Sequence, residues 1–114
     1  MSSMDELKSN LFLEMRRGTI TLCVLSQLKE PHYGYALVET LSARGMRIEP
    51  GTLYPLLRRL EKQGLLTSQW ETSGSKPRKY YVLSDVGKGV YADLQAEWRG
   101  LRGTIDDLMG KEME

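Results

Sequence analysis

One stretch of the chain decides its fold, and it reads Pro50-Gly51-Thr52-Leu53-Tyr54-Pro55-Leu56-Leu57-Arg58-Arg59-Leu60-Glu61-Lys62-Gln63-Gly64. Its leucines stand at i, i+3, i+4 and i+7, the spacing of a helix with one buried face. Gly64 ends this pattern, as glycine commonly does just beyond a helix. Two starts are open, with Pro50 as the first helical residue or Thr52 as the N-cap. We therefore predict an amphipathic helix that ends near Gln63.

The face opposite these leucines follows from a rotation of 100° per residue. It is centred on Gly51, Pro55, Arg58 and Lys62, with Tyr54 and Arg59 on its flanks. Cations and a tyrosine opposite a buried stripe suit insertion into the major groove of DNA. The missing side chain at Gly51 lets backbone amides approach a phosphate. On this helix alone, however, the cations are explained slightly better by solubility.

The segment after the helix changes that balance. Strand-like residues 65–71 and 78–83 are joined by a polar loop rich in turn residues, which predicts a β-hairpin. Its basic tip contains Lys76, Arg78 and Lys79, with no neighbouring acid in the sequence. Such a tip suits a grip on the DNA backbone or minor groove. We expect Trp70, at the end of the first strand, to pack the hairpin against the helical core.

Charge is distributed unevenly along the 114 residues. Residues 50–84 hold six basic and two acidic side chains, whereas residues 1–49 are neutral and residues 85–114 carry a net charge of −3. A basic central region is expected if this part of the chain faces DNA phosphates. Judged by charge alone, chance clustering of cations on a solvated face explains the distribution about as well. The helix and the hairpin tip together favour DNA binding.

The segments before the decisive stretch also predict helices. Residues 5–16 carry a narrow apolar stripe at four-residue spacing, which consists of Leu7, Leu11 and Met15. Residues 19–29 are apolar on most sides and belong at the centre of a core, with Cys23 as a small buried hydrophobe. Residues 33–44 follow helical periodicity, and Gly45 suits the position after a helix C-cap.

A long helix should close the chain. Ser84 is a good N-cap for a helix from Asp85 to about Met109. Its apolar residues form a heptad-like seam of Val90, Leu94, Trp98, Leu101, Ile105 and Leu108. Four glycines interrupt this helix and each weakens it, so it needs a packing partner. We expect that partner to be a second copy of the chain; the alternative is intramolecular packing.

The predicted fold is mainly α with a small β-hairpin. Residues 19–84 form a winged helix-turn-helix, preceded by an N-terminal helix in residues 1–18 that contributes to the dimer contact. Residues 85–114 form a C-terminal dimerisation helix, and all three parts make one structural domain.

The chain resembles the PadR family of bacterial transcriptional regulators. The resemblance is carried by His32-Tyr33-Gly34-Tyr35, by residues 50–66, by Arg78-Lys79-Tyr80-Tyr81-Val82-Leu83-Ser84 and by Gly87. It implies a homodimeric repressor of the small subclass, which has one C-terminal helix and binds double-stranded DNA at a palindromic operator. In that subclass the terminal helices build the dimer, so Leu7 and Leu11 join the seam.

The resemblance also implies which residues contact DNA. Together with the helix face and the hairpin tip, the expected contacts are Tyr35, Gly51, Thr52, Tyr54, Pro55, Arg58, Arg59, Lys62, Lys76, Arg78 and Lys79. For Tyr35, a contact with the DNA backbone and a packing role beneath the recognition helix are equally open.

A small-molecule effector is expected near Trp98. A tryptophan in a dimer seam usually serves packing, but two symmetry-related rings across a slot would hold a planar aromatic molecule between them. Small members of the family are thought to sense hydrophobic or aromatic compounds in this way. Met15 and Leu11 are the expected neighbours of such an effector.

Several other functions are disfavoured by composition. The single cysteine, Cys23, and the single histidine, His32, exclude an intrachain disulfide and metal sites that need several such ligands. We expect no enzyme and no cofactor, because His32 has no evident catalytic partner. No apolar run approaches the roughly 18 residues that span a bilayer, and no signal pattern begins the chain, so we expect a cytoplasmic protein with no membrane partner.

Two alternatives to a PadR-like repressor stay open. One is another class of winged-helix repressor, and the other is a winged-helix protein–protein interaction module without DNA binding.

Overall fold

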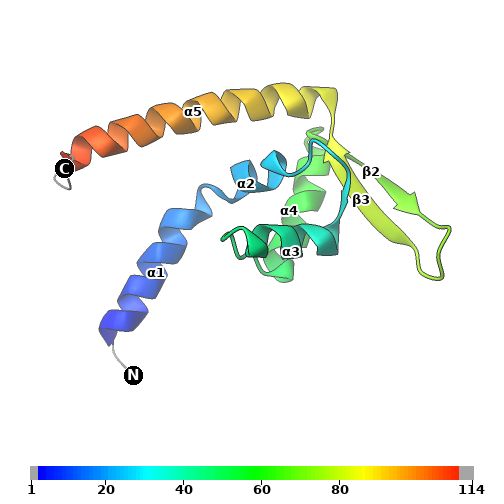
Figure 1. Ribbon diagram of the computed structural model, residues 1–114, viewed down its shortest axis with the longest axis horizontal. Helices are drawn as coiled ribbons and strands as arrows, with labels where there is room; N and C mark the ends of the chain where they lie inside the picture. The colour runs from blue at the N-terminus through cyan, green and yellow to red at the C-terminus, as the bar shows by residue number, and fades with distance from the viewer. Residues whose placement is uncertain (1–2, 111–114) are drawn as a thin grey trace.

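The computed structural model of the chain describes residues 3–110, which form a mainly helical fold with a small antiparallel sheet (Figure 1). In chain order the elements are α1 (Ser3–Arg17), α2 (Ile20–Ser26), β1 (His32–Tyr33), α3 (Gly34–Ala43), α4 (Pro50–Lys62), β2 (Leu66–Glu71), β3 (Arg78–Leu83) and α5 (Asp85–Met109). This is a winged helix-turn-helix between two terminal helices, as the sequence predicted. The expected outer segments, 1–18 and 85–114, include residues 1–2 and 111–114, which lie outside the described residues.

The decisive helix, α4, begins at Pro50. Glu49 is the N-cap in an extended conformation, with φ −70° and ψ 143°. Of the two starts that the sequence left open, Thr52 as the N-cap is therefore wrong. The helix ends at Lys62, and Gly64 follows with φ +85°, a left-handed conformation that favours glycine.

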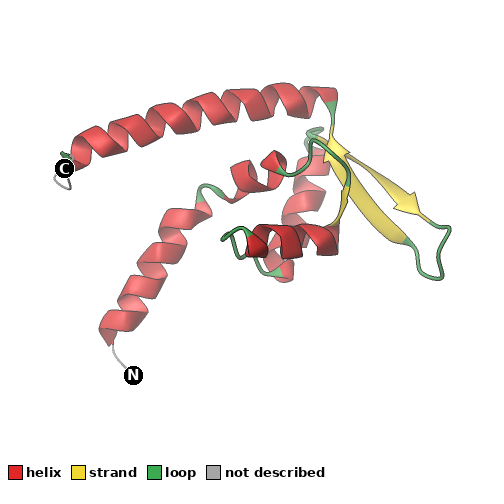
Figure 2. Cartoon of the chain, in the orientation of Figure 1, coloured by secondary structure: helices red, strands yellow, loops and turns green. Residues whose placement is uncertain are grey.

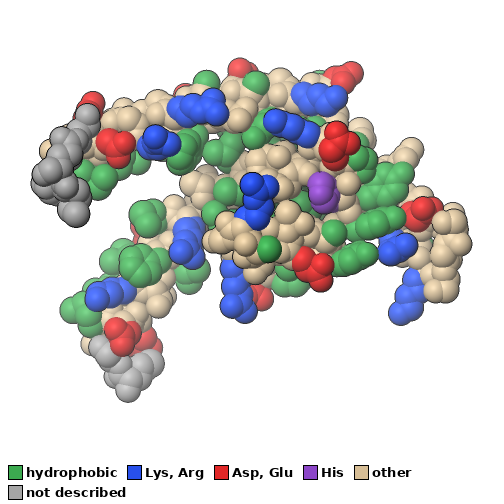
Figure 3. Space-filling model, viewed as in Figure 1, with side chains coloured by type: hydrophobic (Ala, Val, Ile, Leu, Met, Phe, Trp, Pro, Cys, Tyr) green, Lys and Arg blue, Asp and Glu red, His purple; other side chains and the backbone are tan. Residues whose placement is uncertain are grey.

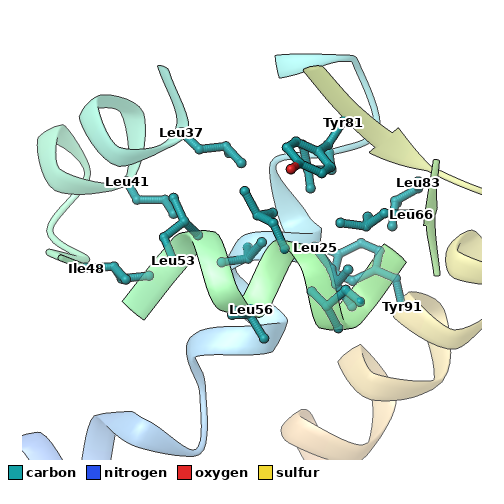
Figure 4. Packing of buried hydrophobic residues seen from close by; sticks show 14 residues of the cluster. Leu25, Leu37, Leu41, Ile48, Leu53, Leu56, Leu66, Tyr81, Leu83 and Tyr91 are labelled. Carbon is teal, nitrogen blue, oxygen red and sulfur yellow. The ribbon is translucent and has the colours of Figure 1, made fainter. Parts of the chain in front are cut away.

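The core is built around the leucine stripe of α4 (Figure 4). Leu53 and Leu57 are completely buried, together with Leu25 of α2 and Leu37 of α3. Figure 4 shows side chains from α3, α4, the sheet and α5 that point toward one another across this cluster. The buried stripe fixes which face of α4 is left for solvent.

The helix α2 lies at the centre of the core, as predicted, but it ends at Ser26 and not at residue 29. The amides of Gln27 and Leu28 bond back to the carbonyls of Val24 and Leu25, both at 3.1 Å, which tightens the last turn. The carbonyl of Leu28 then accepts a hydrogen bond from the Leu83 amide at 2.8 Å. After α2 ends, the backbone of this segment is therefore hydrogen-bonded to strand β3.

The sheet has the order β1-β3-β2, and its strands are confined to one end of the molecule (Figure 2). The predicted hairpin is β2 and β3, which pair from Leu66 with Leu83 to Glu71 with Arg78. The short strand β1, which the sequence did not predict, pairs with β3 through His32 with Tyr81 and Tyr33 with Tyr80. It joins the start of α3 to the hairpin, which is the wing.

The terminal helices extend away from this domain as two arms (Figure 1). None of the residues of α1 is buried, and α5 buries only Gly87 and Tyr91. The predicted N-cap of α5 is confirmed, because Ser84 Oγ accepts from the Gly87 amide at 2.9 Å and donates to the Gly64 carbonyl at 2.6 Å. Hydrophobic side chains line both arms on the visible face of the molecule (Figure 3).

Candidate nucleic-acid interface

The exposed face of α4 is the face that its sequence predicts. Gly51, Pro55, Arg58 and Lys62 are all exposed, directly opposite the buried leucines. The acidic partner of Arg47 is Glu49, and that of Lys79 is Glu61. The guanidinium of Arg58 and the ammonium of Lys62 have no acidic partner within the described residues. This face presents cations that are available to an anionic ligand.

Tyr54 holds α4 against α3. A Cβ added at Gly34 would run into the Tyr54 ring, so the ring lies directly on the first residue of α3. Tyr54 is half-buried, at the boundary between the core and the exposed face. The absence of a side chain at Gly34 thus sets the distance between the two helices of the helix-turn-helix.

A cluster of aromatic rings joins α3 to the wing. The rings of Tyr33 and Tyr35 stack with centroids 5.8 Å apart, and the guanidinium of Arg78 lies 4.7 Å from the Tyr33 centroid. Arg78 Nη1 also donates to the Tyr35 hydroxyl at 3.3 Å. Tyr35 is 48% exposed, so a packing role beneath α4 is wrong. The wing arginine instead contacts Tyr33 of β1 and Tyr35 of α3.

The sequence shows no acidic residue next to Lys79, but in the structure Lys79 pairs with one. Its Nζ is 3.3 Å from Glu61 Oε1 on α4, and the same carboxylate accepts a hydrogen bond from Ser68 Oγ on β2 at 2.5 Å. This hydrogen bond, followed by the nearby ammonium, lowers the pKa of Glu61. The sequence missed the pair because residues 61 and 79 meet only when the sheet packs on α4. We call Glu61, Ser68 and Lys79 the wing latch.

Trp70 does not pack against the helical core, contrary to the prediction from the sequence, because it is 62% exposed. It pairs with Lys79 across the hairpin, and the Lys79 Nζ lies 5.8 Å from its ring centroid. The hairpin projects beyond the helices at this point, so no core surface is within reach (Figure 1). Lys76 is exposed in the loop beyond it.

Trp98 borders a hollow of about 240 Å³ between α2 and α5. Its lining consists of Leu22, Cys23, Ser26, Tyr91, Gln95, Trp98 and Arg99. Burial raises the pKa of the Cys23 thiol, which suits the packing role expected of it. Leu11 and Met15 lie on α1 and do not line this hollow within a single chain.

Comparison with known proteins agrees with this geometry. The model of the transcriptional regulator PadR-like family matches residues 21–93. The chain belongs to the PadR-like family of transcriptional regulators. The chain is 33% identical to Transcriptional regulator Rv3488 of Mycobacterium tuberculosis over 98 residues, which is 85% of this chain and 89% of that protein. The PadR-like family consists of transcriptional regulators, so the chain is no enzyme and binding to DNA is implied.

Solved structures of other PadR-like regulators share the fold of this chain, and two of them illustrate the agreement. The crystal structure of a PadR family transcriptional regulator from Eggerthella lenta is 51% identical, with a TM-score of 0.90 over 94% of this chain and 96% of that one. A PadR-like transcriptional regulator from Bacillus cereus is 29% identical, with a TM-score of 0.75 over 84% and 96% of the two chains. Within the described residues of this PadR-like chain, one long helix, α5, follows the wing.

Within residues 3–110, no helix has both the length and the apolar content that a membrane crossing requires. The same residues contain no cluster of three or more His, Cys, Asp or Glu side chains that would hold a metal ion.

Proposed function

We propose that this PadR-like chain is a homodimeric repressor that places α4 in the major groove of a palindromic operator. The observation that carries the proposal is the exposed face of α4, where Arg58 and Lys62 have no acidic partner within the described residues. Cations that lie opposite a buried stripe are suited to reading guanine edges and to contacting phosphates. Gly51, Thr52, Pro55 and Arg59 complete the proposed contacts from this helix.

The wing provides a second contact with the same DNA. Lys76 lies exposed in its loop, and Arg78 is oriented by Tyr33 and Tyr35. We assign Lys76 and Arg78 to the backbone or minor groove beside the docked helix. Tyr35, which is exposed beside Arg78, is placed to add a backbone contact. Lys79 acts differently: it is held by Glu61 and fixes the angle of the wing to α4.

The proposed dimer uses the two arms. Leu7 and Leu11 of α1 are exposed, as are Leu101, Ile105 and Leu108 of α5. An isolated helix is only marginally stable in water, and an exposed apolar stripe indicates that it packs against a partner. Val90 and Leu94 are half-buried in the chain's own domain, so we limit the intersubunit seam to the part of α5 from Trp98 onward. We infer that α1 of one protomer covers this part of its partner's α5.

We further propose that a small planar aromatic molecule binds at Trp98 and releases the DNA. Trp98 is at once on the exposed seam and at the edge of the hollow against α2. In a dimer, Leu11 and Met15 of the partner's α1 would close the site. Titration with planar aromatics should quench tryptophan fluorescence. The quenching should disappear in Trp98→Ala, whose remaining tryptophan is Trp70; equal quenching in that variant would contradict an effector site here.

The deciding experiment is fluorescence anisotropy with labelled DNA from directly upstream of the protein's own gene, at two salt concentrations. We expect selective binding relative to scrambled DNA, with an affinity that falls steeply with salt because counterions are released. Arg58→Ala should cost about 1–3 kcal/mol on the operator and much less on scrambled DNA. Lys88→Ala, which removes an exposed cation at the start of α5, is the matched control. Failure to bind any DNA at low salt would favour the protein–protein module.

A further inference from the structure

The two flanks of α4 are not equivalent. One flank carries Tyr54 and Glu61, which contact α3 and the wing. The opposite flank carries Thr52 and Arg59, which the 100° rotation per residue places on the other side of the exposed face. The wing therefore lies on one side of the proposed DNA-binding face only, and the second side is free for another contact.

A hollow lies on this second flank, where the end of α1 and the start of α2 meet α4. Its volume is about 370 Å³. The residues that line it are Arg17, Ile20, Thr21, Thr52, Pro55, Leu56 and Arg59. It combines two guanidinium groups and two hydroxyl groups over an apolar floor, and it contains no acidic residue. Neither Arg17 nor Arg59 forms an ion pair among residues 3–110.

We propose that this hollow binds a phosphate of the DNA backbone on the side of α4 that faces away from the wing. The major groove has a sugar-phosphate backbone along each of its two edges, so a helix within it has phosphates on both flanks. The wing is placed to contact one edge, and Arg17, Thr21 and Arg59 are placed to contact the other. Guanidinium groups favour phosphate because their donors match its oxygens in pairs.

This inference rests on the proposed DNA binding and adds Arg17 and Thr21 to it. It also assigns a task to the junction between α1 and α2, which links a proposed dimer arm to the DNA surface. Because the contact is to a phosphate, it should add affinity without adding sequence preference.

The test uses operator duplexes in which one backbone phosphate at a time is replaced by a neutral methylphosphonate. For the wild-type dimer, we expect one position in each half-site, on the edge away from the wing, where the replacement weakens binding about 3- to 10-fold. For Arg17→Ala and Arg59→Ala, replacing the phosphate at that position should not lower the affinity for the operator any further. Their binding to unmodified operator and to scrambled DNA should weaken by similar factors. The slope of log K against log salt should decrease by about 0.9 for each phosphate that the variant no longer neutralises.

Lys88→Ala is again the control and should keep both the wild-type slope and the sensitivity to methylphosphonate. The proposal is overturned if Arg17→Ala keeps the wild-type salt slope and remains sensitive at every position. It is also overturned if sedimentation shows that Arg17→Ala has become monomeric, since Arg17 would then belong to the dimer contact. Tight binding of inorganic phosphate that leaves DNA affinity unchanged would assign the hollow to a free anion and would overturn the proposal as well. Failure of the proposed function is distinct, because the wild-type protein itself would then not bind DNA selectively.

Discussion

At the scale of single residues, two glycines near the start of α5 should respond in opposite ways to the same substitution. A Cβ at Gly87 would run into the backbone carbonyl of Leu65, whereas a Cβ at Gly89 meets nothing within 4 Å. We expect Gly87→Ala to destabilise the protein by about 1–3 kcal/mol, because the backbone must move to relieve the contact. Gly89→Ala should stabilise it by about 0.5–1 kcal/mol, through helix propensity.

Urea denaturation of both variants measures these changes in the free energy of unfolding. The two substitutions add the same methyl group to the same helix two residues apart, so each is the control for the other. If Gly87→Ala were as stable as Gly89→Ala, the close packing of α5 on the segment between α4 and β2 would be contradicted.

At the scale of elements, the wing latch should give the wing a pH dependence. The Ser68 hydroxyl, and after it Lys79, lower the pKa of Glu61 in the folded protein. The unfolded chain therefore binds this proton first as the pH falls, so the stabilisation is complete above the ordinary glutamate pKa and is lost as the pH falls through the lowered value. The effect is small, because solvent screens this partly exposed pair.

Trp70 lies beside Lys79 and reports on this change. In a Trp98→Phe background, which leaves one tryptophan, Trp70 emission should change as the pH falls into the acidic range, with a midpoint below that of free glutamate. Glu61→Gln should remove this transition while the far-UV circular dichroism stays constant. A transition of equal size in Glu61→Gln would mean that another group titrates beside Trp70.

The wing also shows where prediction from the sequence ends. Periodicity and capping residues predicted the helices, because those signals are local to each segment. The strand β1 consists of two residues and forms only because β3 lies beside it. The Glu61–Lys79 pair and the exposure of Trp70 both depend on how far the hairpin extends beyond α4. The helical periodicity of α4 places Glu61 on a flank, but no pattern in the sequence indicates that this flank meets Lys79 of the wing.

At the scale of the whole molecule, the two arms carry most of the large apolar side chains that the chain leaves exposed. Met4, Leu7, Leu11, Phe12, Leu13 and Met15 are exposed on α1, and Trp98, Leu101, Ile105, Leu108 and Met109 on α5. The first part of α5, around Tyr91, is covered by the chain's own core, and beyond it the apolar residues of the heptad pattern are exposed. The sequence predicted a seam along the whole helix, and the structure shows that its apolar residues from Trp98 onward are exposed.

We therefore expect Ile105→Glu to convert the proposed dimer into monomers, because a seam buried between two protomers would have to accept an unpaired carboxylate. Gly103→Glu adds the same charge to the opposite face of α5, where a Cβ meets nothing within 4 Å, and should leave the dimer intact. Sedimentation velocity separates the two results. A dimeric Ile105→Glu would contradict a seam at this position.

The same variant tests whether the dimer organises DNA recognition. A two-fold dimer reads half-sites about one helical turn apart, so about 5 base pairs inserted between them should move one half-site to the opposite face of the DNA. We expect this insertion to lower wild-type affinity to that of Ile105→Glu on the unmodified operator. Monomeric Ile105→Glu should be indifferent to the insertion, because each monomer contacts a single half-site. If the insertion weakened Ile105→Glu as strongly as the wild type, the spacing would act through the DNA itself, and the arms would have no part in aligning the two recognition helices.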